Sequence, residues 1–104
     1  MAFALVFTAQ YNVRAARFLK RHPELRQQYL KTLQLLEANP AHPALRLHPL
    51  RGRLDGLHSV SINLSYRITL ELLIQDGQII PVNVGDHEAL IEQEMLCISP
   101  PGLG

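Results

Sequence analysis

The residue types best suited to proton transfer and to binding of anions are concentrated between residues 46 and 87. Four arginines and three of the five histidines of the chain fall in this stretch: Arg46, Arg51, Arg53, Arg67, His48, His58 and His87. Histidine suits proton transfer because its unperturbed pKa is about 6.5. Arginine keeps its charge and binds oxyanions through a planar fork of donors. We therefore interpret the stretch as one that presents imidazoles and guanidiniums to an anionic partner.

A metal site is the alternative use of the three histidines. The spacing of His48, His58 and His87 matches no zinc signature. The single cysteine, Cys97, excludes an internal disulfide framework and a cysteine-based zinc site. We predict neither a metal nor a cofactor, and the low cysteine content fits a reducing, cytoplasmic setting.

The N-terminal part of the chain predicts one strand and two helices. Residues 3–7 are all apolar, which is typical of a strand that is central or covered on both faces. Thr8 is the expected N-cap of a helix over residues 9–21. Pro23 suits the first turn of a second helix, which Asn39 and Pro40 end. One side of the first helix carries a row of arginines that we interpret as solvated rather than RNA-contacting: Arg14, Arg17 and Arg21.

The next part of the chain predicts a meander of strands. Residues 45–50 are expected to form a short strand or an extended loop, and residues 57–63 alternate as a strand does. Asp76 and Gly77 predict a hairpin between two apolar runs. Pro81 places the returning strand, residues 78–84, at an edge or marks an irregularity. The side expected to face the helices holds His58, Val60, Ile62, Ile68, Leu70, Leu72 and Ile74. The opposite side holds Leu57, Ser59, Ser61, Asn63, Arg67, Thr69 and Glu71.

We expect a last helix over residues 87–95, with Asp86 as its N-cap and His87 at its first position. The 104 residues, 47% of them hydrophobic and 18% charged, are expected to form one domain, residues 1–104, with a frayed tail over residues 98–104. The apolar N-terminus is interpreted as a strand rather than a signal peptide. The predicted fold class is α+β, with a helical hairpin packed on one face of a small, mostly antiparallel sheet whose other face is at least partly open.

Three pieces of sequence, in this order of elements, resemble the RelE/ParE superfamily of toxins from type II toxin–antitoxin systems. They are Leu47-His48-Pro49-Leu50 with Gly52 and Gly56, then Ser65-Tyr66-Arg67, then Gly85-Asp86-His87. The branch that the sequence resembles is that of the YafQ-like mRNA interferases. The resemblance covers nearly the whole chain and implies the β-α-α-β-β-β(-α) RelE-like fold.

The resemblance also implies an activity and its residues. RelE-like toxins cleave mRNA in the ribosomal decoding site by attack of a ribose 2′-OH on the adjacent phosphate, and a cognate antitoxin neutralises them. His48, Arg67 and His87 match catalytic positions of that family, and Tyr66 falls where YafQ-like toxins have an aromatic residue. The residues expected to bind the RNA are Arg46, Arg51, Arg53 and Tyr66, and among them Arg51 and Arg53 are suited to contacts with its backbone.

Two positions depart from the pattern of the YafQ-like branch. Ser61 stands where that branch has a second active-site histidine, and Asn83 stands where it has an arginine. The formal net charge of +1 is also lower than is usual in the family. These departures leave a second hypothesis open. It is a protein without nuclease chemistry, either a ParE-like toxin that inhibits gyrase or an inactive relative that binds an antitoxin and operator DNA.

Overall fold

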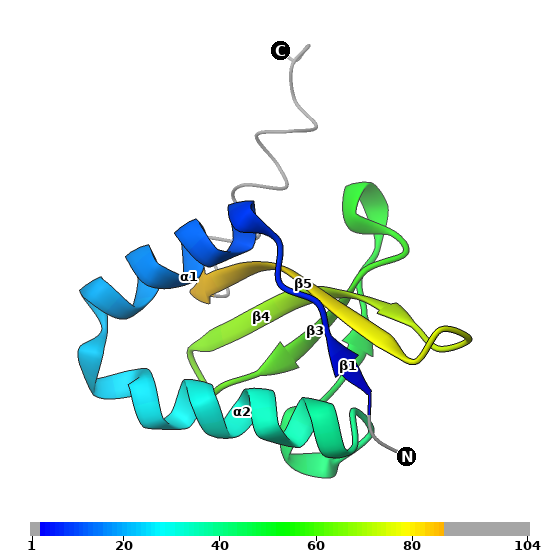
Figure 1. The fold of residues 1–104 in the computed structure, drawn as a ribbon, viewed down its shortest axis with the longest axis horizontal. Helices are drawn as coiled ribbons and strands as arrows, with labels where there is room; N and C mark the ends of the chain where they lie inside the picture. Colours follow the sequence, from blue (N-terminus) through cyan, green and yellow to red (C-terminus); the bar gives the residue numbers. More distant parts are fainter. Residues whose placement is uncertain (1–2, 87–104) are drawn as a thin grey trace, which may run out of the picture.

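In the computed structural model, which describes residues 3–86, two helices cover one face of a five-stranded sheet (Figure 1). The helices are α1 (Ala9–Arg21) and α2 (Arg26–Ala38), with the 3-10 turn η1 (Pro23–Leu25) between them. The five strands are β1 (Ala4–Leu5), β2 (His48–Pro49), β3 (His58–Ser61), β4 (Tyr66–Leu73) and β5 (Gln78–Asp86). Two further 3-10 turns, η2 (Pro43–Leu45) and η3 (Gly52–Leu54), flank β2. The predicted α+β class and helical hairpin are confirmed.

The strands lie in the order β1-β5-β4-β3-β2. The meander β3-β4-β5 is antiparallel, as predicted, and β2 adds an antiparallel edge strand beside β3. The prediction of a central or doubly covered strand at the N-terminus is wrong, because β1 is a two-residue edge strand that pairs with β5 in parallel. Its flanking residues Val6 and Phe7 are 36% and 43% exposed. Apolar composition alone did not distinguish a short edge strand from a central one.

Helix α1 has the bounds that the sequence predicts. The side chain of Thr8 accepts a hydrogen bond from the backbone N–H of Tyr11 at 3.1 Å, which satisfies one of the unpaired donors of the first turn. The second helix begins at Arg26 rather than at Pro23, because Pro23 starts the 3-10 turn η1. Neither helix is long and apolar enough to cross a membrane, and the same holds for every helix among residues 3–86.

The core lies between the helices and the sheet. Its members on the strands are Val60, Ile68, Leu70, Ile79 and Val84, and its members on the helices include Tyr11, Phe18, Tyr29 and Leu36. Ile74, which was predicted on the same buried side, is 70% exposed because β4 ends at Leu73. The opposite sheet face is less open than predicted, because Ser59 and Thr69 in its middle are 2% and 4% exposed.

Strand β5 is irregular at the position that Pro81 marks. Thr69 pairs with Asn83 and Leu70 pairs with Pro81, so Val82 is an extra residue on β5 and forms a β-bulge. Pro81 is buried on the core side, beyond the two residues of β5 that pair with β1. The predicted irregularity is therefore confirmed.

The end of β5 differs from the sequence prediction. The strand was expected to stop at Val84, with a helix cap at Gly85 and Asp86. In the structure Gly85 pairs with Arg67 and Asp86 pairs with Tyr66, so both residues belong to the strand. His87 and the helix expected over residues 87–95 lie outside the described residues.

A buried pair of tyrosines connects the two helices. The hydroxyl groups of Tyr11 in α1 and Tyr29 in α2 are 2.8 Å apart and hydrogen-bonded. Burial raises the pKa of both phenols above the usual value of about 10. Because both pKa values are raised, the pair contributes its stability below about pH 10 and loses it as the pH rises further.

We predict that Tyr11→Phe lowers the free energy of unfolding by about 1–3 kcal/mol, because it leaves the hydroxyl of Tyr29 buried without its partner. The double variant Tyr11→Phe/Tyr29→Phe should cost less than the sum of the single variants, because it removes both polar groups. Urea denaturation of the unmodified protein, the two single variants and the double variant measures these free energies of unfolding. Strictly additive costs would contradict the role given to the hydrogen bond.

Candidate functional site

Arg67 lies on the sheet face opposite the helices, as predicted. Its neighbour Ile68 is fully buried in the core, and successive side chains of a strand point to opposite faces. The half-buried Arg67 side chain reaches across β3, where its Nη1 donates a hydrogen bond to Oγ of Ser59 at 3.4 Å. No ion pair forms between Arg67 and either Glu71 or Asp55, which are described residues. Among the described residues, the guanidinium is thus positioned by a neutral hydroxyl.

His48 lies on the same face, at the edge of the sheet. It pairs with Ser59 across the β2–β3 ladder, so the two side chains project to the same side. Its Nδ1 is 3.1 Å from the carbonyl oxygen of Arg46. A carbonyl oxygen only accepts hydrogen bonds, so Nδ1 must donate, which leaves Nε2 as the acceptor of the neutral ring. The structure thus places an imidazole and a guanidinium on either side of Ser59.

The basic residues expected to contact RNA surround His48 in the chain. Arg46 and Arg51 are exposed and flank β2 on its two sides. Arg46 has a left-handed backbone conformation with φ of 50°, and this turn directs its carbonyl to the ring of His48. The backbone of Arg53 lies in η3, and its side chain lies outside what the structure describes.

The two positions that depart from the YafQ-like pattern also lie on this face. Ser61 pairs with Arg67, and its hydroxyl donates to the carbonyl of Asn63 at 2.6 Å. Asn83 pairs with Thr69, and its side-chain oxygen accepts from the backbone N–H of Val84 at 2.9 Å. Both side chains are engaged in local hydrogen bonds, which suit them to hold the β3–β4 turn and the end of β5.

His58 lies on the core side of the sheet, as predicted, opposite Leu70 and Pro49. Its Nδ1 is buried and has no hydrogen-bond partner among the described residues. His48 and His58 point to opposite faces, so they cannot ligate one metal ion together. Among residues 3–86, no three His, Cys, Asp or Glu side chains lie close enough to hold a metal.

Tyr66 is separated from Arg67 although the two residues are adjacent in the chain. Tyr66 points toward α1, where its ring lies 5.4 Å from the ring of Phe18 and 4.7 Å from that of His22. The predicted RNA-contacting residues therefore do not all share one surface. His48 and Arg67 lie on the face away from the helices, whereas Tyr66 lies at the end of α1.

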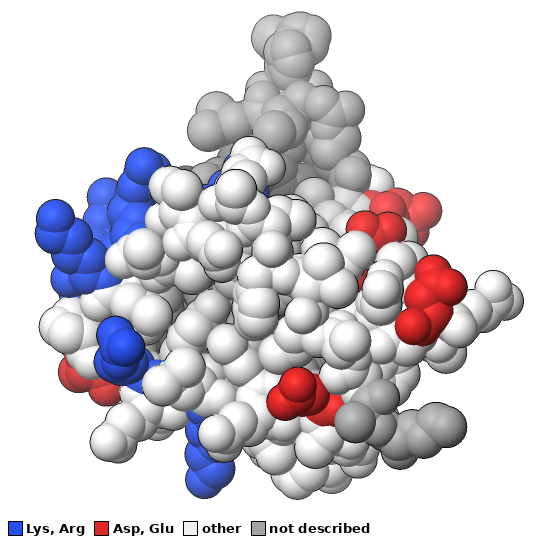
Figure 2. Space-filling model, in the orientation of Figure 1, with Lys and Arg blue, Asp and Glu red and all other residues white. Residues whose placement is uncertain are grey.

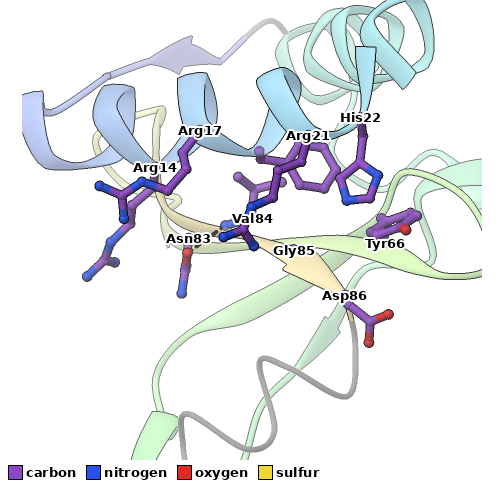
Figure 3. A pocket seen from close by; sticks show the side chains of 10 residues that line it. Arg14, Arg17, Arg21, His22, Tyr66, Asn83, Val84, Gly85 and Asp86 are labelled. Atoms are coloured by element: carbon purple, nitrogen blue, oxygen red, sulfur yellow. Dashed lines mark hydrogen bonds between the residues drawn. The ribbon is translucent and has the colours of Figure 1, made fainter. Parts of the chain in front are cut away.

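Tyr66 belongs to a cleft of about 650 Å³ between α1 and the end of β5 (Figure 3). The cleft is lined by the arginine row of α1, by two aromatic rings and a histidine at its end, and by the last residues of β5. Its ten residues are Arg14, Arg17, Phe18, Arg21, His22, Tyr66, Asn83, Val84, Gly85 and Asp86. Figure 2 shows lysine and arginine side chains gathered around α1 and the α1–α2 turn, whereas most of the visible acidic side chains lie toward the β4–β5 hairpin.

Sequence analysis missed this cleft. The interpretation of the arginine row as solvated is correct for Arg17 and Arg21, whose side chains are exposed. It is wrong for Arg14, which is half-buried and donates from Nη1 to the carbonyl of Val82 at 2.9 Å. The spacing of the arginines along one helix side was visible in the sequence. The bulge that turns the Val82 carbonyl toward α1 was not.

The fold described here is that of the RelE-like toxins. The structure is similar to that of YafQ from E. coli strain BL21(DE3), with a TM-score of 0.63 and 20% identity over 85% of this chain and 97% of that one. A YoeB/ParE toxin from Agrobacterium tumefaciens gives a TM-score of 0.67 and 14% identity over 82% of this chain and 99% of that one. A chain of the E. coli DinJ–YafQ toxin–antitoxin complex gives a TM-score of 0.61 and 23% identity over 86% of this chain and 98% of that one. No protein-family model matches the chain, and no curated protein matches its sequence.

We predict that Arg14→Ala lowers the free energy of unfolding by about 1.5–3 kcal/mol, because it removes a charged donor from the bulge carbonyl of Val82. The control is Arg17→Ala on the same helix side, which should change stability by less than about 0.5 kcal/mol because Arg17 is exposed. Thermal and urea unfolding measure both. Equal effects of the two substitutions would contradict a structural role for Arg14.

Proposed function

We propose that the chain is the toxin of a type II toxin–antitoxin system and that it cleaves mRNA on the ribosome in the cytoplasm. The observation that carries this proposal is the approach of Arg67 and His48 from two different strands to Ser59. The RelE-like fold supports it, because the matched structures include YafQ and a toxin–antitoxin complex. Together, Arg67 and His48 would offer one cation to a phosphate and one proton acceptor to a hydroxyl.

The proposed reaction is transesterification within the RNA. The ribose 2′-oxygen attacks the adjacent phosphorus, the bond from phosphorus to the 5′-oxygen breaks, and the products are a 2′,3′-cyclic phosphate and a 5′-hydroxyl. His48 would take the proton of the 2′-OH at Nε2, since its Nδ1 is held by the carbonyl of Arg46. Arg67 would stabilise the charge that develops on the phosphorane.

The proton for the leaving 5′-oxygen would come from His87. The sequence resemblance indicates this residue, which lies one position beyond the described chain. Gly85 pairs directly with Arg67, so His87 follows the backbone partner of Arg67 by two residues in the chain. Arg46 and Arg51, exposed on both sides of β2, would hold the RNA backbone near His48.

The proposed partner is a cognate antitoxin. The sheet face around Leu57 and the basic residues that flank β2 would take a segment of it as an amphipathic helix or an added strand. Co-expression with the gene encoded beside this one should relieve growth arrest, and the two proteins should purify together. A chain that is tolerated on overexpression and has no such partner would not be a toxin of this kind.

A second function, inhibition of gyrase by a non-catalytic ParE-like toxin, is favoured by a separate observation. The hydroxyl of Ser61, at a position where the YafQ-like branch has a histidine, is committed to the carbonyl of Asn63. The second active-site histidine of that branch is thus replaced by a group that does not transfer protons near neutral pH. A supercoiling assay run beside the cleavage assay separates the two functions.

We predict that Arg67→Ala lowers mRNA cleavage by about 10²–10³-fold, as expected for loss of a group that stabilises the transition state. His48→Ala and His87→Ala should each cost about 10²–10⁴-fold. Arg67→Lys should restore only part of the activity, because the ammonium keeps the charge but not the fork. Primer extension on translated mRNA measures all four.

The matched control is Glu71→Ala, an exposed substitution on the same strand and the same face as Arg67. It should leave cleavage nearly unchanged. Cleavage that survives Arg67→Ala at the level of the control would contradict the assignment of Arg67.

A further inference from the structure

The lining of the cleft between α1 and β5 is predominantly basic, with three arginines and one carboxylate, that of Asp86. Its three arginines follow one another at positions i, i+3 and i+7 of α1, where like charges repel. Nδ1 of His22 lies 3.6 Å from a carboxylate oxygen of Glu24, a contact that involves neither Arg17 nor Arg21. Figure 3 shows the side chains of Arg14, Arg17 and Arg21 extending from α1 toward β5, while Asp86 points away from them.

Aromatic rings close the cleft at the end of this row. His22 directly follows α1, and its ring lies 5.0 Å from that of Phe18 and 4.7 Å from that of Tyr66. Both His22 and Tyr66 are half-buried, so part of each ring is accessible from the cleft. A row of cations that ends at a ring platform is the pattern by which proteins hold single-stranded nucleic acids, through backbone phosphates and stacked bases. An acidic peptide would use the cations but would have no need of the rings.

Strand β5 forms one wall of the cleft and pairs with β4, the strand that carries Arg67. Gly85 and Asn83 line the cleft, and their partners on β4 are Arg67 and Thr69. Neighbouring strands are about 4.8 Å apart. A single-stranded RNA that follows the edge of β5 in the cleft is therefore separated by one β-strand from the backbone of Arg67, whose side chain extends on to Ser59 of β3.

We propose that this cleft is a second RNA-binding surface, which holds a single-stranded segment next to the scissile phosphate. Arg17 and Arg21 bind its phosphates, and His22 with Tyr66 stacks a base. Arg14 contributes charge while its hydrogen bond to Val82 holds the wall of the cleft in place. The rise of an α-helix separates Arg14 from Arg21 by about 10 Å along the axis, enough for more than one phosphate. The part of this inference that concerns cleavage rests on the proposed function.

The test is fluorescence anisotropy with a labelled single-stranded oligoribonucleotide whose 2′-hydroxyls are methylated, so that it binds without being cleaved. Arg17→Ala/Arg21→Ala should weaken binding at least ~10-fold at about 100 mM salt and lower the slope of log K against log salt by about 1.4, since each phosphate contact contributes about 0.7. His22→Ala should weaken binding about 5-fold or more through loss of stacking.

The matched control is Lys20→Ala/Lys31→Ala, which removes the same charge from exposed positions that do not line the cleft. It should change binding by less than ~3-fold, because screened charges outside the cleft contribute little. Equal losses in the two double variants, or no binding of the RNA by the unmodified protein, would overturn the inference. A labelled poly-glutamate peptide that binds as tightly as the RNA, with the same dependence on Arg17 and Arg21, would also overturn it and assign the cleft to an acidic protein segment.

The same proteins separate this inference from the proposed function. If the unmodified protein does not cleave but binds RNA through Arg17 and Arg21, the cleft is confirmed and the nuclease function is wrong. If it cleaves and the Arg17→Ala/Arg21→Ala variant binds RNA normally, the cleft is wrong and the nuclease function is unaffected.

Discussion

The register of β4 against β3 and β5 is the constraint on which the rest of the structure depends. Ile68 pairs with Val60 and Val84, and all three are in the core. This pairing forces Arg67 onto the face away from the helices and Tyr66 onto the face toward α1. A slip of one residue would bury a guanidinium and expose an apolar side chain, which costs several kcal/mol. The packing of the core thus fixes where the candidate chemistry takes place.

Strand β5 connects the β4 register to the position of α1. Its bulge at Val82 turns a carbonyl toward α1, and Arg14 binds that carbonyl. Pro81 has no N–H to donate to the ladder, and it lies next to the bulge, where the regular ladder is interrupted. Because one arginine of the α1 row is held at the strand, the row is aligned with the edge of β5. A structural hydrogen bond and a candidate RNA surface therefore depend on one local irregularity.

The sequence predicted most of the fold, because its signals were local. Thr8, the hairpin turn at Asp76 and Gly77, and the alternation through Ile68 and Leu70 each predict one element without reference to the others. The edge position of β1, the continuation of β5 through Asp86 and the bulge at Val82 depend on partners far away in the chain. For the same reason the approach of His48 and Arg67 to Ser59 could be expected only in outline. The alternation of a strand separates Tyr66 from Arg67, but the packing of Tyr66 against Phe18 and His22 depends on where α1 lies.

The most direct test of the account is the chemistry of the cleaved RNA ends. An mRNA translated in the presence of the protein should be cut to a 2′,3′-cyclic phosphate and a 5′-hydroxyl, and a single 2′-deoxy substitution before the scissile phosphate should abolish the cut. Both results should be unchanged by EDTA in a cleavage step carried out on preassembled ribosome complexes, as long as those complexes stay intact. Ends that carry a 5′-phosphate, or cleavage that persists at the 2′-deoxy position, would contradict the proposed site of Arg67, His48 and His87.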